Sequence, residues 1–186
     1  YQKRASKGGG DPLAHLEGPL FDDYLHDMRL MQRYADLNRK AIVDTIMSGL
    51  SLSGSDRFTT IHNYIDTEKM ILRKGAVSAQ EGERLIIPLN MRDGSLLCIG
   101  KGNGQWNYSA PHGAGRSMSR REARRVLDLK AYRSMMQGIY TTSVSKATLD
   151  ECPLAYKPLS AVLDHITPTV DVIEQIKPIY NFKAAE

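Results

Sequence analysis

The spacing of apolar residues changes near Arg57, and this change most constrains the fold. Before it, apolar residues recur at close to helical spacing until Gly49. After it, four short aliphatic or β-branched segments (59–67, 69–77, 83–91 and 94–102) have a period of two. A long amphipathic helix followed by strands is therefore predicted. We expect the helix to pack into a core along one stripe, made of Phe21, Tyr24, Leu25, Met28, Met31, Ala35, Ile42 and Ile46.

Turn and cap residues set the order of the remaining elements. The Asp93-Gly94 pair is typical of a tight hairpin, so the strands around it should pair antiparallel. Ser119 and Glu122 form a capping box that begins a helix running to about Leu129.

The rest of the chain mixes short elements without regular alternation. Residues 131–140 and a segment beginning near Pro158 should be helical, 140–144 could extend, and 176–184 should end the chain as a strand. This order predicts an α+β fold with mixed or antiparallel sheets and flanking helices.

Length and composition narrow the class of protein. The 186 residues suit one domain or part of a larger one, and 41% hydrophobic and 25% charged residues are ordinary for a soluble protein. No apolar run approaches the roughly 18 residues of a membrane span. We therefore expect a cytoplasmic protein. Residues 1–18 should be a loop or linker, and the start at Tyr1 in place of Met suggests that the sequence is a portion of a longer one.

The two cysteines, Cys98 and Cys152, do not form a C-x-x-C motif. We expect buried thiols in place of a zinc site or a disulfide framework.

His112 is the first candidate for chemistry. A neutral imidazole can attack phosphorus or bind a metal, and the Gly113–Gly115 loop before a helix start could bind an anion through its amides. Arg116 and Arg120 could add charge-assisted contacts to phosphate. The excess of Arg and Lys between 116 and 130 also favours an anionic partner. The alternatives are a histidine packed in a turn and a solvated basic helix face.

Other histidines give weaker signals. His62 lies in a strand segment, where a core histidine is more common than a ligand, and Asn63 should point to the opposite face. His15, His26 and His165 are assigned no role. The sequence contains no Walker loop, G-x-S-x-G elbow, H-E-x-x-H pair or Rossmann fingerprint after a strand.

Several strings together resemble the RtcB-type RNA ligase family. They are HNYID, ILRKGAVSAQEGERLIIPLNM, GKGNGQWNYSAPHGAGRSMSR and the closing YNFKA, and the resemblance runs from about Asp11 to the end. The most specific part is HGAGR-x-MSR following an HNY element. The resemblance implies an enzyme that joins RNA 2′,3′-cyclic phosphate or 3′-phosphate ends to 5′-hydroxyl ends, using GTP and Mn²⁺ through a histidine-GMP intermediate.

The resemblance also implies a role for each matching residue. His112 would be the nucleophile, His62 a manganese ligand, and Arg116 and Arg120 contacts to RNA phosphate. The nucleotide-contacting set would comprise Asn63, Pro88, Leu89, Asn90, Met91, Ser95, Gly113, Ala114, Gly115, Tyr156 and Lys183.

Two departures from the family pattern bear on this assignment. Leu89 and Asn90 replace small or hydroxyl residues, which suggests a divergent branch with an altered nucleotide pocket. The family's other metal ligands, an aspartate, a cysteine and two histidines, lie in an N-terminal half that this sequence lacks. We therefore expect the C-terminal portion of one RtcB-like catalytic domain, which needs that half for manganese binding and guanylylation. The alternatives are a non-catalytic RNA- or phosphate-binding module and a metal-dependent RNA-end phosphatase.

Overall fold

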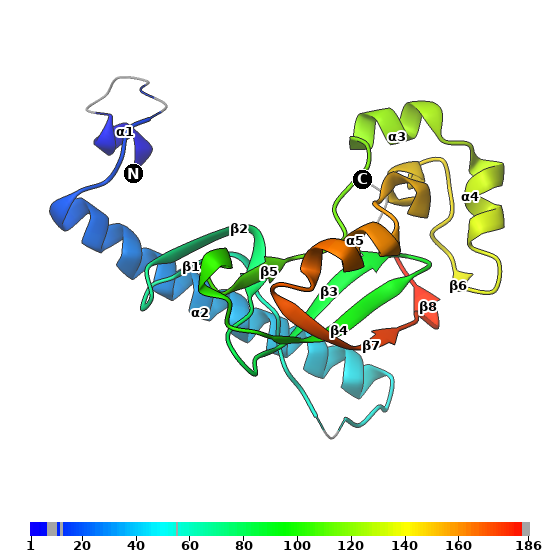
Figure 1. Ribbon diagram of the computed structural model, residues 1–186, viewed down its shortest axis with the longest axis horizontal. Coiled ribbons are helices and arrows are strands. Elements are labelled where there is room, and N and C mark those ends of the chain that lie inside the picture. The colour runs from blue at the N-terminus through cyan, green and yellow to red at the C-terminus, as the bar shows by residue number, and fades with distance from the viewer. Residues whose placement is uncertain (7–10, 12, 55, 184–186) are drawn as a thin grey trace. The chain divides into compact units, whose positions relative to one another are not determined.

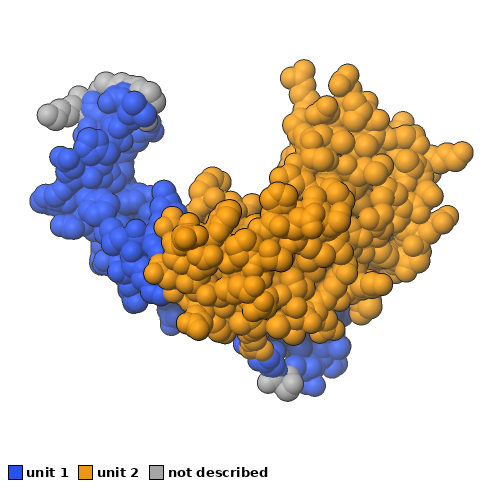
Figure 2. All heavy atoms as spheres, viewed as in Figure 1, with its two compact units in different colours: residues 1–57, 64–72 blue, residues 58–63, 73–186 orange. Residues whose placement is uncertain are grey.

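The computed structural model describes residues 1–6, 11, 13–54 and 56–183. The chain forms two compact units (Figure 2): unit 1 contains residues 1–57 and 64–72, and unit 2 contains residues 58–63 and 73–186. Within the segment expected to be a loop, Gln2–Ala5 forms a single helical turn, α1, while residues 7–10 and 12 lie outside the described part.

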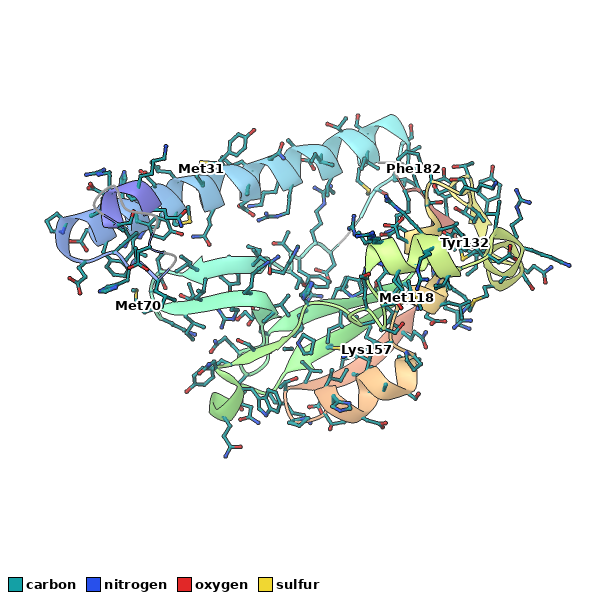
Figure 3. The ribbon with its side chains drawn as sticks, turned by 90° about the horizontal axis from the view of Figure 1, so that it is seen from above. Met31, Met70, Met118, Tyr132, Lys157 and Phe182 are labelled. Atoms are coloured by element: carbon teal, nitrogen blue, oxygen red, sulfur yellow. The ribbon has the colours of Figure 1, made fainter. Side chains whose placement is uncertain are left out.

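Unit 1 is built on the predicted long helix, α2, which spans Gly18–Gly49 and has a proline in its first turn. The ring of Tyr1 packs edge-on against Tyr24 at a centroid distance of 5.2 Å. Leu25 is the buried residue of α2. The expectation that the whole apolar stripe lies in a core is wrong for Met31 (Figure 3), Ile42 and Ile46, which are 58%, 50% and 52% exposed. The reason is that the described elements of unit 1 do not cover the stripe along its full length.

In the part of the chain that the structure describes, the strands form two three-stranded sheets and one short pair. Figure 1 shows their arrangement. The first sheet has the order β1-β2-β5, with β1 at His62–Asp66, β2 at Ile71–Ser78 and β5 at Ser109–Pro111. The second has the order β3-β4-β7, with β3 at Arg84–Asn90, β4 at Gly94–Gly100 and β7 at Val170–Ile176. β6 (Tyr140–Thr141) and β8 (Tyr180–Asn181) pair in parallel.

The predicted β3–β4 hairpin is confirmed, because Leu85 pairs with Cys98 and Ile87 with Leu96 in antiparallel register. β7 was not predicted. β7 pairs antiparallel with β4. Its residues are largely exposed, and its sequence contains two acidic residues and a glutamine.

Short helices complete unit 2. They are η1 (Gly104–Trp106), α3 (Arg120–Val126), α4 (Leu129–Met135), η2 (Leu149–Glu151), η3 (Pro153–Ala155) and α5 (Leu159–Ile166). The serine half of the predicted capping box is confirmed, because the Ser119 hydroxyl accepts a hydrogen bond from the Glu122 N–H at 3.1 Å. Asp128 caps the next helix by accepting the Ala131 N–H at 3.0 Å, so the helix expected to reach about Leu129 ends earlier and α4 follows directly.

The main core of unit 2 lies where α5 packs against the strands, through Val162 and Ile166. A second cluster is centred on Tyr132 (Figure 3), which is fully buried on α4. Cys98 and Cys152 are both free and buried, as predicted, and burial raises the pKa of the Cys98 thiol to about 11. The fold is α+β, and among the described residues no helix is both long and apolar enough to cross a bilayer.

Of the described glycines, Gly94 has the least space for a side chain. Its φ is +76°, and a Cβ there would lie well inside van der Waals contact of the Ile176 carbonyl oxygen on β7. Gly94→Ala should therefore lower the free energy of unfolding by at least about 3 kcal/mol. Gly82→Ala is the matched control, because Gly82 has φ +74° but open space around its Cβ; it should cost about 1 kcal/mol. Equal losses in urea unfolding would contradict the packing at Gly94.

Candidate functional site

The outer edge of β3 anchors the loop that carries His112. The Ile86 N–H donates to the Thr60 hydroxyl at 3.0 Å, and Pro88 has no N–H to satisfy. The Pro88 carbonyl accepts the Ala114 N–H at 2.9 Å. A Cβ on Gly113 would lie 3.1 Å from that same carbonyl, so the lack of a side chain permits the close approach.

His62 and His112, the predicted manganese ligand and the predicted nucleophile, lie next to each other. Their rings stack with centroids 5.2 Å apart and planes 10° apart. Gly75, with φ +68°, connects the two segments: its N–H donates to Asn63 Oδ1 at 2.6 Å and its carbonyl accepts the His112 N–H at 3.4 Å. The surrounding cavity, which we call the histidine pocket, has a volume of about 230 Å³ and is lined by Phe58, Thr60, His62, Val77, Ile86, Pro88 and His112.

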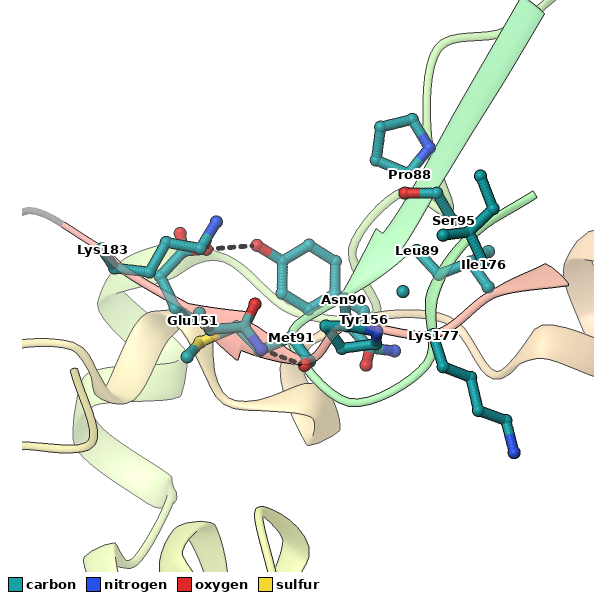
Figure 4. Close-up of a pocket in the computed structure, with 13 residues that line it drawn as sticks. Pro88, Leu89, Asn90, Met91, Ser95, Glu151, Tyr156, Ile176, Lys177 and Lys183 are labelled. Atoms are coloured by element: carbon teal, nitrogen blue, oxygen red, sulfur yellow. Dashed lines mark hydrogen bonds and ion pairs between the residues drawn. The ribbon is translucent and has the colours of Figure 1, made fainter. Parts of the chain in front are cut away.

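A larger cavity of about 330 Å³, the tyrosine pocket, surrounds Tyr156 (Figure 4). Its lining includes seven of the predicted nucleotide contacts: Pro88, Leu89, Asn90, Met91, Ser95, Tyr156 and Lys183. It also includes Gly94, Glu151, Ile176, Lys177, Pro178 and Asn181. Pro88 therefore lines both this pocket and the histidine pocket. The predicted contacts Asn63, Gly113, Ala114 and Gly115 are not among the lining residues of the tyrosine pocket.

Backbone pairing with the His112 loop fixes the position of Tyr156. Arg116 and Tyr156 form an antiparallel bridge. The Lys157 N–H donates to the Gly115 carbonyl at 3.1 Å, and the Ser117 N–H donates to the Ala155 carbonyl at 3.0 Å. The loop after His112 and the tyrosine thus belong to one hydrogen-bonded unit.

The Glu151 carboxylate contacts three polar side chains at the border of the tyrosine pocket. Its Oε2 accepts the Tyr156 hydroxyl at 2.9 Å and lies 3.2 Å from Lys183 Nζ, while its Oε1 accepts Arg116 Nη2 at 3.0 Å. Burial acts to raise the pKa of Glu151, but Lys183, Tyr156 and Arg116 outweigh it, so that the pKa lies below its ordinary value of 4.5. Burial and the neighbouring Glu151 charge raise the pKa of Tyr156 to about 12.

A third cavity of about 100 Å³, the arginine pocket, adjoins this border. It is lined by Arg120, Arg124, Ala147, Thr148, Asp150, Glu151 and Lys183. The Asp150 carboxylate is 4% exposed and lies 3.1 Å from Arg124 Nε and 3.9 Å from Arg120 Nε. Three cationic side chains face two carboxylates here, which suits a phosphate group.

The two arginines predicted to contact RNA phosphate have different surroundings. Arg116 donates to the Asp150 carbonyl at 2.7 Å and stacks over the Tyr156 ring at 4.7 Å. Arg120 is 55% exposed and lines the arginine pocket. Arg116 therefore orders protein groups in this structure, whereas Arg120 lines a pocket that a phosphate could enter.

The departures at Leu89 and Asn90 have structural explanations. Leu89 is 3% exposed and packs in the main core. The Asn90 Oδ1 accepts the N–H groups of Arg92 and Asp93 at 3.0 and 2.9 Å, and its Nδ2 donates to the Asp93 carboxylate at 2.8 Å. The Asn90 side chain thus closes the β3–β4 turn.

Within the described residues, no three His, Cys, Asp or Glu side chains gather in a cluster that could hold a metal ion. His62 alone of the predicted ligands lies at the site, so a manganese ion would need ligands beyond those these residues bring together.

Sequence reasoning missed Asp150, Glu151 and Arg124. The available signal was an acidic pair five or six residues before Tyr156, in a chain whose 116–130 segment is rich in arginine. Adjacent acids in such a chain are natural partners for those arginines, but the sequence does not show which cations they meet.

Comparison with known proteins places these residues in a family context. A family model described as tRNA-splicing ligase RtcB matches residues 12–184. The RNA-splicing ligase RtcB of Escherichia coli K12 is 30% identical over 180 residues, which cover 88% of this chain and 44% of that protein. The tRNA-splicing ligase RtcB of Aeropyrum pernix is 34% identical over 108 residues, or 53% of this chain and 22% of that protein. The chain thus spans less than half the length of these relatives.

Acid should weaken the Glu151 cluster. Because the folded pKa of Glu151 is depressed, its contribution to stability is fully present above pH 4.5 and is lost as the pH falls through the folded pKa. The difference in unfolding free energy between the wild type and Glu151→Gln should be largest at pH 7 and should shrink as the pH falls below 4.5. Urea unfolding at several pH values measures it, and a difference independent of pH would contradict the ion-pair assignment.

Proposed function

The chain belongs to the RtcB family, and on that premise we propose that the protein is an RNA ligase that joins RNA 2′,3′-cyclic phosphate or 3′-phosphate ends to 5′-hydroxyl ends. In this proposal, GTP is the energy source and His112 is the nucleophile. The observation that carries it is the placement of His112, stacked on His62, in a pocket that shares Pro88 with the tyrosine pocket.

The proposed first step is nucleotidyl transfer to His112. An unprotonated ring nitrogen attacks the α-phosphorus of GTP, a P–N bond forms, and the bond to pyrophosphate breaks. A 2′,3′-cyclic phosphate end is first hydrolysed: water attacks its phosphorus and the bond to the 2′-oxygen breaks, which leaves a 3′-phosphate. An oxygen of the 3′-phosphate then attacks the phosphorus of the His112 adduct, and the P–N bond breaks. Finally the 5′-hydroxyl attacks the 3′-phosphate phosphorus, the new phosphodiester bond forms and GMP leaves.

The tyrosine pocket is the proposed site of the guanine nucleotide. Its volume of about 330 Å³ is within the range of small-ligand pockets. The Tyr156 ring offers a stacking surface, and Lys183 and Glu151 offer polar contacts to a base. Figure 4 shows the Tyr156 ring between the Glu151 side of the pocket and the Pro88 and Ser95 side.

The arginine pocket is the proposed contact to RNA phosphate, with Arg120 as the binding residue. Manganese, bound in part by His62, would neutralise phosphate charge in the full reaction. In this proposal, the residues of this chain supply the nucleophile, the nucleotide pocket and the phosphate contact.

Formation of a covalent GMP adduct on His112 is the expected outcome that distinguishes this function. Full-length protein incubated with GTP and Mn²⁺ should gain an acid-labile GMP adduct, detectable by mass spectrometry. His112→Ala should lose it entirely, because no other group replaces the attacking nitrogen. His165→Ala is the control, since His165 hydrogen-bonds the Ala161 carbonyl on α5 and should keep the adduct. An adduct that persists in His112→Ala would refute the assignment.

A second candidate is a non-catalytic RNA-binding module, favoured by the arginine pocket. It would show RNA binding without any adduct in the full-length protein. A metal-dependent RNA-end phosphatase would instead release inorganic phosphate without joining ends.

RNA binding should depend on Arg120 in either case. The slope of log affinity against log salt concentration should fall by about 0.7 in Arg120→Ala for single-stranded RNA, because one phosphate contact is lost. Lys101→Ala, which removes a cation paired with Asp171 at 3.0 Å, should leave the slope unchanged. Filter binding at several salt concentrations measures both, and equal slopes for Arg120→Ala and the wild type would contradict the phosphate contact.

A further inference from the structure

Glu151 occupies the boundary between two of the cavities. It lines both the tyrosine pocket and the arginine pocket, and Lys183 does the same. Its side chain is 17% exposed, and both of its carboxylate oxygens have partners. A carboxylate in this position can influence the geometry of both pockets at once.

The partners of Glu151 come from three separate parts of the chain. Arg116 follows the His112 loop, Tyr156 follows η3, and Lys183 lies just beyond β8. Arg116 also contacts Tyr156 directly, with Nη2 3.1 Å from the hydroxyl. The four side chains therefore form one network, and the carboxylate is the acceptor that its three donors share.

The shared acceptor controls where these donors point. Without a carboxylate, Arg116, Lys183 and the Tyr156 hydroxyl would lose a common partner, and the two cations would no longer be held beside each other. An amide in the same place cannot accept from all three groups, because its nitrogen only donates and at the Oε2 position would face the Lys183 ammonium, which also only donates.

We infer that Glu151 is a positioning residue that holds the guanine-nucleotide site and the RNA-phosphate site in a common geometry, so that its loss weakens the binding of both ligands. The inference rests on the proposed function, because it takes the tyrosine pocket as the nucleotide site and the arginine pocket as the phosphate site. Glu151 acts through Tyr156, Lys183 and Arg116.

The test measures the two affinities separately in the full-length protein. GMP binding is followed by calorimetry, and binding of a short 3′-phosphorylated oligoribonucleotide by fluorescence anisotropy. Glu151→Gln should weaken each by about tenfold, which corresponds to the loss of one charge-assisted contact. Glu151→Asp, which keeps the charge on a shorter side chain, should lose less affinity for both ligands.

Glu83→Gln is the matched control. Glu83 is also a half-buried carboxylate with two hydrogen bonds, from the Ser78 hydroxyl at 2.6 Å and the Gln80 N–H at 2.9 Å. It does not line either pocket, so Glu83→Gln should bind both ligands as the wild type does. Loss of both affinities in this control would mean that general destabilisation explains the result, and would overturn the inference.

A double-mutant cycle separates positioning from a purely structural role. Tyr156→Phe removes the hydroxyl that donates to Glu151, and its effect on GMP affinity should be smaller in the Glu151→Gln background than in the wild type. Additive effects would overturn the inference, as would a Glu151→Gln protein that loses affinity for only one ligand. If Glu151→Gln is unfolded at the assay temperature, the same comparisons of GMP and RNA affinity are made with Glu151→Asp.

Failure of the inference and failure of the proposed function give different results. A wild-type protein that binds no GMP and forms no adduct overturns both. A wild type that binds GMP and RNA, together with a folded Glu151→Gln that binds them equally well, overturns only the role of Glu151.

Discussion

The hydrogen bond from the Ala114 amide to the Pro88 carbonyl is the contact on which the rest of the site depends. It is possible because Pro88 lies on the outer strand of its sheet, where a missing N–H leaves no gap in the ladder. It fixes the loop after His112 against β3, and Pro88 itself lines cavities on both sides. His112 and the tyrosine pocket are thus positioned by the same backbone segment of β3.

The charged groups of the site are organised by acids as much as by arginines. Asp150 and Glu151 are adjacent on η2, yet they face different partners: Asp150 lies against Arg120 and Arg124, and Glu151 against Arg116 and Lys183. A cluster of cations alone would repel itself and remain mobile. The two carboxylates hold the cations in defined positions while leaving the local charge positive, which suits an anionic substrate.

Much of the fold could be predicted from local signals. The β3–β4 hairpin, the Ser119 cap and α5 each depend on a few neighbouring residues, and each was confirmed. β7 was missed because its partner strand, β4, lies about 70 residues earlier, and pairing at that distance leaves no local pattern. The exposed stripe on α2 was misjudged for a similar reason, since periodicity shows that a face is apolar but not whether another element covers it.

The residues of the candidate site also fall into two groups, those that the sequence could predict and those that it could not. His112 and its glycines could be named from a short motif, and the resemblance to a family supplied His62, Tyr156 and Lys183. Glu151 could not be found like this, because its role arises where three distant segments meet. The roles of Asn90 and Arg116 likewise depend on hydrogen bonds that only the folded chain shows.

The stacking of His112 on His62, with Gly75 beside the ring, bears on the entropy of the proposed reaction. A histidine side chain samples several rotamers, and a nucleophile gives up that freedom before it attacks. Although His112 is exposed, the parallel ring of His62 at 5.2 Å and the Gly75 backbone beside it limit the space in which the imidazole can turn. Less of that freedom then remains to be lost when a phosphate approaches in the proposed reaction.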